Sequence, residues 1–190
     1  MSGHVGWWAR WGGWGLVVAC VSTSVGADID AVKRVTGLSA SEREAMLQAH
    51  NRWRAQVSVP PLVWSDALAQ SAARWAAQLD QGGQCGMQHS DVDDLGENLY
   101  WASPVRWNNG QRTQQEIRPA FVVDVWGQES ADFQAATNLC RPGKTCGHYT
   151  QIVWRATREV GCAMRVCGAQ DQVWVCQYLP AGNYIGQRPY

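Results

Sequence analysis

The sequence predicts a single domain of the α+β class, and three observations support this prediction. Three segments place apolar residues at helical spacing, β-prone runs gather near the end of the chain, and five cysteines follow from Cys140 onward. After removal of a leader, about 160 residues remain, which is near the commonest domain size. Such a chain forms a core by itself, so we expect its disulfides to reinforce the packing.

The first helix is predicted to begin at a capping box, Ser39-Ala-Ser-Glu42, whose side chains satisfy backbone amides of the first turn. Pro60-Pro61 ends this segment, because proline cannot continue a helix. The residues that recur at helical spacing are Met46, His50, Trp53 and Val57. His50 shares the core-facing stripe, so we interpret it as a structural hydrogen-bonding residue.

Two further helices are predicted. One follows a cap at Ser65, stops at Gly82-Gly83, and has a buried stripe of Leu68, Ala72, Trp75 and Leu79. The other starts near Pro119, because proline is favoured in the first turn of a helix. Its apolar face is expected to comprise Phe121, Val122, Val125, Trp126 and Phe133.

Three β-prone runs follow the last helix: His148–Trp154, Val160–Cys167 and Gln172–Tyr178. The segment 168–171 between the last two runs predicts a hairpin.

Residues 84–118 show no sustained period, so we expect a long, irregular connection of the kind that often carries function. Its aromatic residues, Tyr100, Trp101 and Trp107, are either ordinary core or the lining of a groove for a lipid or protein partner.

Residues 1–27 are predicted to be a secretory signal peptide. Arg10 lies in the n-region, an apolar run covers Leu16 to Val21, and Val25-Gly-Ala27 offers small residues for cleavage. An alternative stays open, because Val17-Val-Ala-Cys20 resembles a bacterial lipoprotein cleavage box. The protein is then either secreted, or a periplasmic or outer-membrane lipoprotein that touches the membrane through a lipid on that cysteine.

Six of the seven cysteines lie outside the leader, and an even number in an exported chain indicates disulfides. If the hairpin turns symmetrically about Ala169, Cys162 faces Cys176 across the two strands. Alternation then puts Cys167 on the opposite face. A cytosolic metal site is disfavoured, since no pair has the C-x-x-C spacing of zinc ribbons.

The other four cysteines follow by elimination. Cys140 and Cys146 close a short loop around Pro142-Gly143, which leaves Cys85 for Cys167.

The charge of the chain excludes some classes of partner. Its 16 basic residues balance 16 acidic ones, without a long run of either sign. A nucleic-acid partner or a polybasic membrane contact therefore has no support.

Several motifs make the chain resemble a known family. Two stretches match signatures of the CAP superfamily: Gly147-His-Tyr-Thr-Gln-Ile-Val-Trp154 and Tyr178–Tyr190. This superfamily comprises cysteine-rich secretory proteins, antigen 5 and plant pathogenesis-related class 1 proteins. Further matching segments are His50-Asn51, Pro61-Leu-Val-Trp64, Cys85-Gly-Met-Gln-His-Ser90 and Gly96-Glu-Asn-Leu99. We assign residues 38–190 to a CAP domain, similar to the plant pathogenesis-related class 1 proteins.

The resemblance implies a three-layer α-β-α sandwich, with a small antiparallel sheet between helical layers. It also implies three disulfides, which agree with the pairing argued from the hairpin: Cys85 to Cys167, Cys140 to Cys146, and Cys162 to Cys176.

The resemblance further implies a cleft built from two histidines and two glutamates, which fall here on His89, Glu97, Glu129 and His148. Neutral imidazoles bind zinc and other divalent metals, so His89 and His148 are the expected ligands, with the glutamates orienting the rings. The alternative is that each histidine and glutamate simply satisfy each other's hydrogen bonds. No catalytic residue is assigned.

From the family we expect a secreted, non-enzymatic binding module that acts in defence or host interaction, in some relatives as an allergen. Its expected partners are a sterol or fatty acid, or a protein receptor. One alternative is a metal-dependent extracellular hydrolase or protease that uses the same four residues. Another is a precursor that releases Pro180–Tyr190 as a signalling peptide, although relatives that do so usually carry Asn where Gln177 stands.

Overall fold

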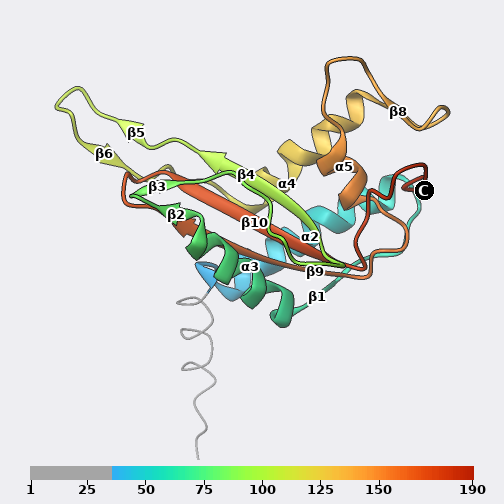
Figure 1. Cartoon of the computed structure of the whole chain (residues 1–190), viewed down its shortest axis with the longest axis horizontal. Coiled ribbons are helices and arrows are strands. Elements are labelled where there is room, and N and C mark those ends of the chain that lie inside the picture. Colours follow the sequence, from blue (N-terminus) through green and yellow to red (C-terminus); the bar gives the residue numbers. More distant parts are fainter. Residues whose placement is uncertain (1–35) are drawn as a thin grey trace, which may run out of the picture.

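The computed structural model describes residues 36–190, in which helices cover both faces of a four-stranded sheet (Figure 1). The strand order is β1 (Val63–Trp64), β9 (Glu159–Val166), β10 (Gln172–Leu179), β4 (Gly96–Ala102). β10 pairs antiparallel with both β9 and β4, and β1 pairs parallel with β9. The predicted leader, with Cys20, lies outside the described residues.

Two helical layers enclose this sheet. Helix α3 (Asp66–Gln78) packs against β9 and β10 on one face. The other face is covered by α2 (Ala40–Gln56), α4 (Pro119–Gly127) and α5 (Gly147–Ile152). The architecture is therefore the expected α+β, three-layer α-β-α sandwich.

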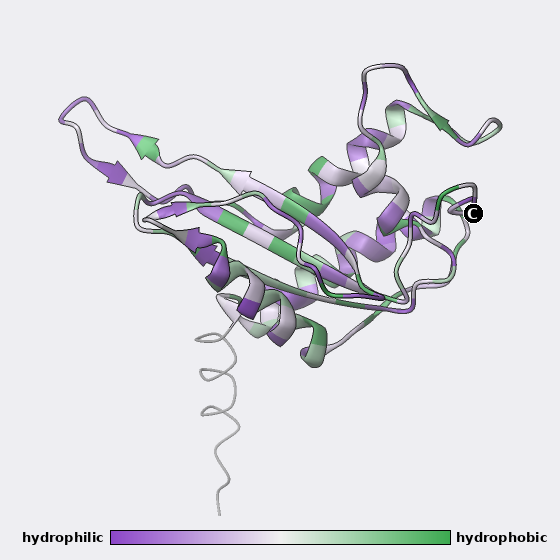
Figure 2. Cartoon of the chain, in the orientation of Figure 1, coloured by the Kyte–Doolittle hydropathy of each residue, from purple (hydrophilic) through white to green (hydrophobic). Residues whose placement is uncertain are grey.

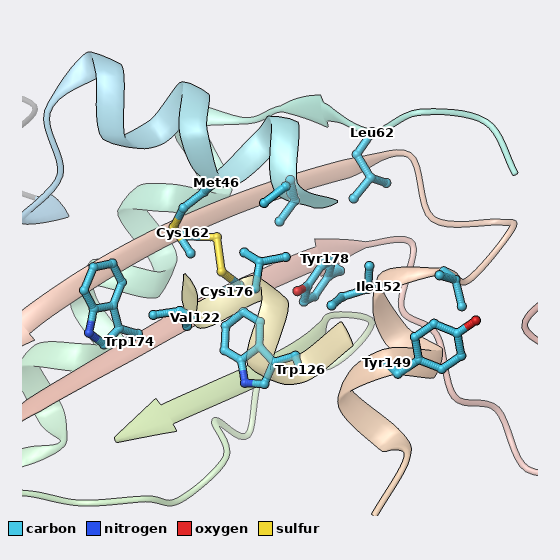
Figure 3. Close-up of a cluster of buried hydrophobic side chains, with 14 of the residues drawn as sticks. Met46, Leu62, Val122, Trp126, Tyr149, Ile152, Cys162, Trp174, Cys176 and Tyr178 are labelled. Atoms are coloured by element: carbon cyan, nitrogen blue, oxygen red, sulfur yellow. A yellow bond between two sulfur atoms is a disulfide. The ribbon is translucent and has the colours of Figure 1, made fainter. Parts of the chain in front are cut away.

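Alternation along β10 divides the core into two parts. Trp174, Cys176 and Tyr178 point to the larger core, under α2, α4 and α5 (Figure 3). Val173 and Val175 point to the smaller core, under α3. Because both faces of the strand are buried, β10 reads as a nearly continuous apolar run rather than as an alternating pattern.

Short elements complete the fold. Three small hairpins lie outside the main sheet: β2 (Asp80–Gln81) pairs with β3 (Gln84–Cys85), β5 (Val105–Arg106) with β6 (Arg112–Thr113), and β7 (Phe133–Gln134) with β8 (Leu139–Cys140). A 3-10 turn, η1 (Gln128–Ala131), continues α4. The β5–β6 hairpin extends well beyond the end of the sheet (Figure 1).

The first two helices match their predictions. Ser39 and Glu42 form the expected capping box at the start of α2: Ser39 Oγ accepts from the Glu42 amide at 3.3 Å, and Glu42 Oε2 accepts from the Ser39 amide at 2.7 Å. Helix α3 follows Ser65, as predicted. Glycine at position 161 lets α3 lie close to the sheet, because a Cβ there would stand 2.2 Å from the Ala69 nitrogen.

The predicted strand at His148–Trp154 is wrong, because these residues form α5 and the turn that follows it. The first turn of α5 is held from outside the segment: the Glu129 carboxylate accepts hydrogen bonds from the amides of His148 and Tyr149. Tyr149 and Ile152 then bury one side of the helix in the larger core. These tertiary contacts outweigh the local preference of aromatic and β-branched residues for strands.

The irregular connection predicted for residues 84–118 contains strand β4, which the sequence pattern missed. The third helix also ends earlier than predicted: α4 stops at Gly127, and Phe133 lies in β7. Phe121 is exposed rather than part of the apolar face.

Of the aromatic residues of this region, Tyr100 packs against the larger core, whereas the two tryptophans do not belong to it. Trp101 and Trp107 are exposed, and Tyr100 is half-buried, where its ring meets Phe121 edge-on at 6.4 Å between centroids.

All three expected disulfides are present: Cys85–Cys167, Cys140–Cys146 and Cys162–Cys176. Cys162 lies directly opposite Cys176 in the strand pairing, which places the centre of the hairpin at Ala169. Within residues 36–190, no helix is both long and apolar enough to cross a membrane.

The last residues of the chain are tied to the body of the domain. The Arg155 amide donates to the Pro189 carbonyl at 2.7 Å, and Arg188 donates to the carbonyls of Ala135 and Ala136. The Tyr190 ring packs against Phe133, with centroids 6.2 Å apart. The segment 180–190 is therefore part of the folded domain, although Ile185 is fully exposed.

Candidate functional site

In the structure the four predicted residues form two histidine–glutamate pairs. In the first, His89 Nδ1 lies 3.0 Å from Glu97 Oε1. Glu97 is in β4, and its second carboxylate oxygen accepts from Ser90 Oγ at 2.8 Å and from Gln177 Nε2 at 3.0 Å. The glutamate side chain is 5% exposed and the imidazole is 64% exposed, so the carboxylate is fixed and the ring faces solvent.

The pKa values in this pair move in opposite directions. The hydrogen bond to Glu97 raises the pKa of His89 above its usual value. Burial alone would raise the pKa of Glu97, but the hydrogen bonds from His89, Gln177 and Ser90 outweigh it and leave that pKa lower than usual. The pair is therefore charged over a wider pH range than either residue would be in water.

The second pair lies where α5 meets η1. His148 Nδ1 is 2.6 Å from Glu129 Oε1, and Glu129 Oε2 accepts from the backbone amides of His148 and Tyr149 at 2.9 and 3.1 Å. The imidazole also stacks on Trp126, with ring centroids 6.1 Å apart and planes 16° from parallel. Its orientation is therefore fixed by one carboxylate and one indole.

Asn98 connects the second pair to the buried core. Its side-chain amide donates to the His148 carbonyl at 3.1 Å and to the Tyr178 hydroxyl at 3.2 Å. The Tyr178 hydroxyl is also 2.8 Å from His50 Nε2, while His50 Nδ1 lies 2.8 Å from the Met46 carbonyl. Burial lowers the pKa of His50 to about 4, so this ring is neutral near pH 7.

This chain of hydrogen bonds confirms that His50 is a structural residue. It also identifies Asn98 as a residue that sequence reasoning missed, although Asn98 stands inside the Gly96-Glu-Asn-Leu99 motif. Within this motif a role is predicted only for the neighbouring Glu97, and none for Asn98.

The donor set of the two pairs fits a divalent transition metal. In each pair Nδ1 is occupied by a carboxylate, and within residues 36–190 neither Nε2 has a hydrogen-bonding partner. This is the arrangement in which a carboxylate orients an imidazole whose other nitrogen binds zinc. His89 and His148 would be the ligands, and the two glutamates would orient them.

A different group of three potential ligands is drawn together in the described part of the chain. Ligand atoms of Cys85, Cys167 and Asp171 lie within 4.8 Å of one another. The two cysteines are joined as a disulfide, so neither offers a thiolate. No three of the four histidine and glutamate side chains come as close, so a metal there would need water to complete its coordination.

A groove of about 890 Å³ lies on the α2–α4 side of the sheet. Its walls are Glu42 at the start of α2, the segment 113–119 before α4, and the strand residues Met164, Gln172 and Trp174. Two buried polar atoms in these walls, the Trp174 indole Nε1 and the Gln172 Oε1, have no hydrogen-bonding partner within the described residues 36–190. Gln172 Nε2 donates to the Gln115 carbonyl at 2.8 Å, which fixes the orientation of the amide.

Comparison with known proteins assigns the chain to a family. Residues 47–178 match the cysteine-rich secretory protein family, CAP. The chain belongs to the CAP family. It is 39% identical over 144 residues to "Pathogenesis-related protein PR-1 type" of Sambucus nigra, a match that covers 76% of this chain and 79% of the relative. This CAP protein is therefore similar to the plant pathogenesis-related class 1 proteins.

Solved structures agree with the fold. Na-ASP-1 superimposes with a TM-score of 0.63 and 26% identity over 80% of this chain, which spans 42% of Na-ASP-1. NaASP2, solved with Zn2+, superimposes with a TM-score of 0.62 and 25% identity over 81% of this chain and 87% of that protein.

Proposed function

We propose that this CAP protein is a secreted, non-enzymatic binding module that takes a hydroxyl-bearing lipid of the sterol class into the groove between α2 and α4. Export is supported by the family and by three disulfides within residues 36–190, which form in oxidising compartments. A role in defence is supported by the similarity to pathogenesis-related relatives.

The observation that carries this proposal is the pair of unpartnered polar atoms in the groove wall. Leaving such a buried group unpaired costs about 1–3 kcal/mol, so a ligand that pairs both gains affinity. Trp174 offers an N–H donor and Gln172 an acceptor oxygen. They are two positions apart on one face of β10, roughly 7 Å along the strand.

The two atoms distinguish between lipid head groups. A hydroxyl both accepts and donates, so a sterol hydroxyl can pair with either atom, accepting from the indole N–H or donating to the amide oxygen. An ionised carboxylate only accepts, and would leave Gln172 unpaired. The groove therefore favours a sterol over a fatty acid, and its apolar residues, Ile117, Met164 and Trp174, would contact the ring system.

The test is binding of radiolabelled cholesterol and palmitate to the purified protein, with Trp174→Phe as the diagnostic variant. This change keeps an aromatic ring and removes the donor, so sterol binding should weaken about tenfold. Trp64→Phe, which removes an indole donor outside the groove, is the matched control. Failure of both lipids to bind, or an equal effect of the two variants, would contradict the proposal.

A divalent metal site at His89 and His148 is a second candidate function. The supporting observation is that both imidazoles use Nδ1 for a carboxylate, which leaves Nε2 for a metal. Calorimetric titration with Zn²⁺ should show one site that is lost in His89→Ala and in His148→Ala. Asp93→Asn, at an exposed carboxylate, should bind normally. Unchanged binding in both histidine variants would remove this candidate.

Two alternative functions would depend on different residues. A metal-dependent hydrolase would need the metal to activate water, with Glu97 or Glu129 moving the proton. Activity that survives both chelation and His148→Ala would exclude this hydrolase.

The other alternative is a precursor that releases Pro180–Tyr190, which first requires the contacts of Arg188 and Tyr190 to break. Detection of the free undecapeptide in producing tissue decides that alternative. A protein receptor stays a further possible partner.

A further inference from the structure

The β5–β6 hairpin carries two like charges in direct opposition. Arg106 lies opposite Arg112 in the strand pairing. Directly opposed residues share one face with Cβ atoms about 5 Å apart, and like charges at such positions repel. Within residues 36–190 neither guanidinium forms an ion pair, and residues 103–115 contain no acidic side chain. Arg112 interacts electrostatically with the Asp171 carboxylate without forming an ion pair with it. An anion bound between the two guanidiniums would therefore relieve their mutual repulsion further.

The other face of the hairpin presents an aromatic surface. Trp107 is 55% exposed, and its indole N–H donates to Thr113 Oγ1 at 3.0 Å, which fixes the ring against the opposite strand. The tip is a tight turn closed by the Trp107 amide, which donates to the Gln111 carbonyl at 2.9 Å. Gly110 has a φ of 82°, a left-handed conformation that suits glycine.

The tip itself is hydrophilic (Figure 2). A hollow of about 550 Å³ is lined by Arg106, Trp107, Asn108, Asn109 and Gln111, so it joins the cationic and the aromatic faces. The amide side chains offer both donors and acceptors, which suits a ligand with many hydroxyl groups.

We propose that this hairpin binds an acidic polysaccharide built from uronic acids. The opposed guanidiniums match carboxylates, which arginine binds through two parallel hydrogen bonds. The indole face packs on the C–H groups of a pyranose ring, and the tip amides bond its hydroxyls. Because the arginines and the indole lie on opposite faces, a polymer that crosses the tip contacts both, whereas a single sugar acid does not.

The same features disfavour insertion into a lipid bilayer. A membrane-inserting hairpin buries its tip, and here that would remove Asn108, Asn109 and Gln111 from water without partners. The proposal is independent of the sterol groove and of the metal candidate, because none of the residues lining the hollow belongs to either.

The experiment is affinity electrophoresis and calorimetry of the full protein with polygalacturonate at low salt, with dextran, galacturonic acid monomer and phosphatidylserine vesicles as comparisons. We expect binding to polygalacturonate alone, weakened at least tenfold between 50 and 500 mM NaCl, in line with an ionic contact. Arg106→Gln/Arg112→Gln should reduce affinity at least tenfold, and Trp107→Ala several-fold.

Two matched controls make the result specific. Arg74→Gln/Arg155→Gln removes the same charge from exposed sites elsewhere, and Tyr184→Ala removes an aromatic side chain that is 48% exposed. Neither should change binding. Thermal unfolding checks the fold: Arg112→Gln should not lower the midpoint, because it relieves repulsion. The proposal is overturned by an equal loss in the charge control, by binding to vesicles instead, or by no binding to polygalacturonate.

Discussion

At the residue scale, one buried cation organises a corner of the molecule. Arg54 is fully buried and donates to four backbone carbonyls, those of Pro60, Ile152, Trp154 and Thr157. Burial lowers its pKa to about 10, so the side chain is still charged at neutral pH. The guanidinium thereby ties α2 to the turn after α5, across a sequence separation of about 100 residues.

Replacing Arg54 with lysine should therefore be costly although it keeps the charge. A lysine ammonium cannot span four acceptors that a planar guanidinium reaches. We expect Arg54→Lys to lose about 2–4 kcal/mol of unfolding free energy, measured by urea denaturation. Arg52→Lys, at an exposed ion pair with Asp124 at 3.4 Å, should lose less than about 0.5 kcal/mol. Equal losses would show that the four hydrogen bonds do not matter.

The pKa of His89 gives a prediction about metal binding. The imidazole must be neutral to bind a metal, and Glu97 raises its pKa, so protons compete at a higher pH than for a free histidine. Zinc affinity should fall as pH drops through the raised pKa. Glu97→Gln should shift this fall to lower pH, as followed by NMR titration of the ring and by calorimetry. Glu116→Gln, outside the site, should leave the titration unchanged.

At the element scale, the contact between α3 and the sheet depends on a missing side chain. A Cβ at Gly161 would stand 2.2 Å from the Ala69 nitrogen and 2.4 Å from the Ser65 carbonyl oxygen, both backbone atoms that cannot rotate away. Gly161→Ala should therefore push α3 off β9 and cost at least 2–3 kcal/mol, of the order known for overpacked cores. Gly82→Ala meets no atom within 4 Å, but its φ of 65° adds backbone strain.

A cleaner comparison is Gly147→Ala, whose Cβ meets only Asn183 Nδ2, at 3.9 Å. This variant should stay within about 0.5 kcal/mol of the wild type in chemical denaturation, because its new methyl group fits without a clash. If Gly161→Ala is equally mild, the sheet and α3 are not packed as described.

Elements also differ in how well the sequence predicts them. Strands β9 and β10 and the Cys162–Cys176 bond were predictable, because two β-prone runs joined by a short turn define the register of a hairpin locally. Helix α5 was not predictable, because its first turn depends on hydrogen bonds to Glu129, which lies outside the helix. The burial of Arg54 was equally hidden, since its carbonyl partners lie far along the chain. The four residues His89, Glu97, Glu129 and His148 were named from the family motifs, not from spacing, and which glutamate pairs with which histidine was not predicted.

At the scale of the whole molecule, His50 makes stability depend on pH. The unfolded chain accepts a proton on this ring near its usual pKa of 6.5, whereas the native state does so only near 4. Protons therefore favour the unfolded chain in this range, and stability falls as pH drops from 6.5 toward 4. The shift corresponds to about 3 kcal/mol at most.

This loss is measurable by urea denaturation at pH 7, 5 and 4. His50→Gln keeps a polar side chain but does not titrate, so its stability should fall less over that range than that of the wild type. The difference between the two proteins should therefore shrink by about 3 kcal/mol. A constant difference would mean that the His50 ring has the same pKa in the native and unfolded states.

The bond between Cys85 and Cys167 also determines what a protease can do to this protein. It closes a covalent loop of sequence separation 82, and His89, Glu97, Glu129 and His148 all lie inside that loop. A single cut anywhere between them leaves both fragments attached, so an extracellular protease can nick the domain without separating the two halves of its site. A cut after Leu179 lies beyond all three disulfides, so one cleavage can set the segment 180–190 free, just as a cut before Cys85 can free the residues that precede it.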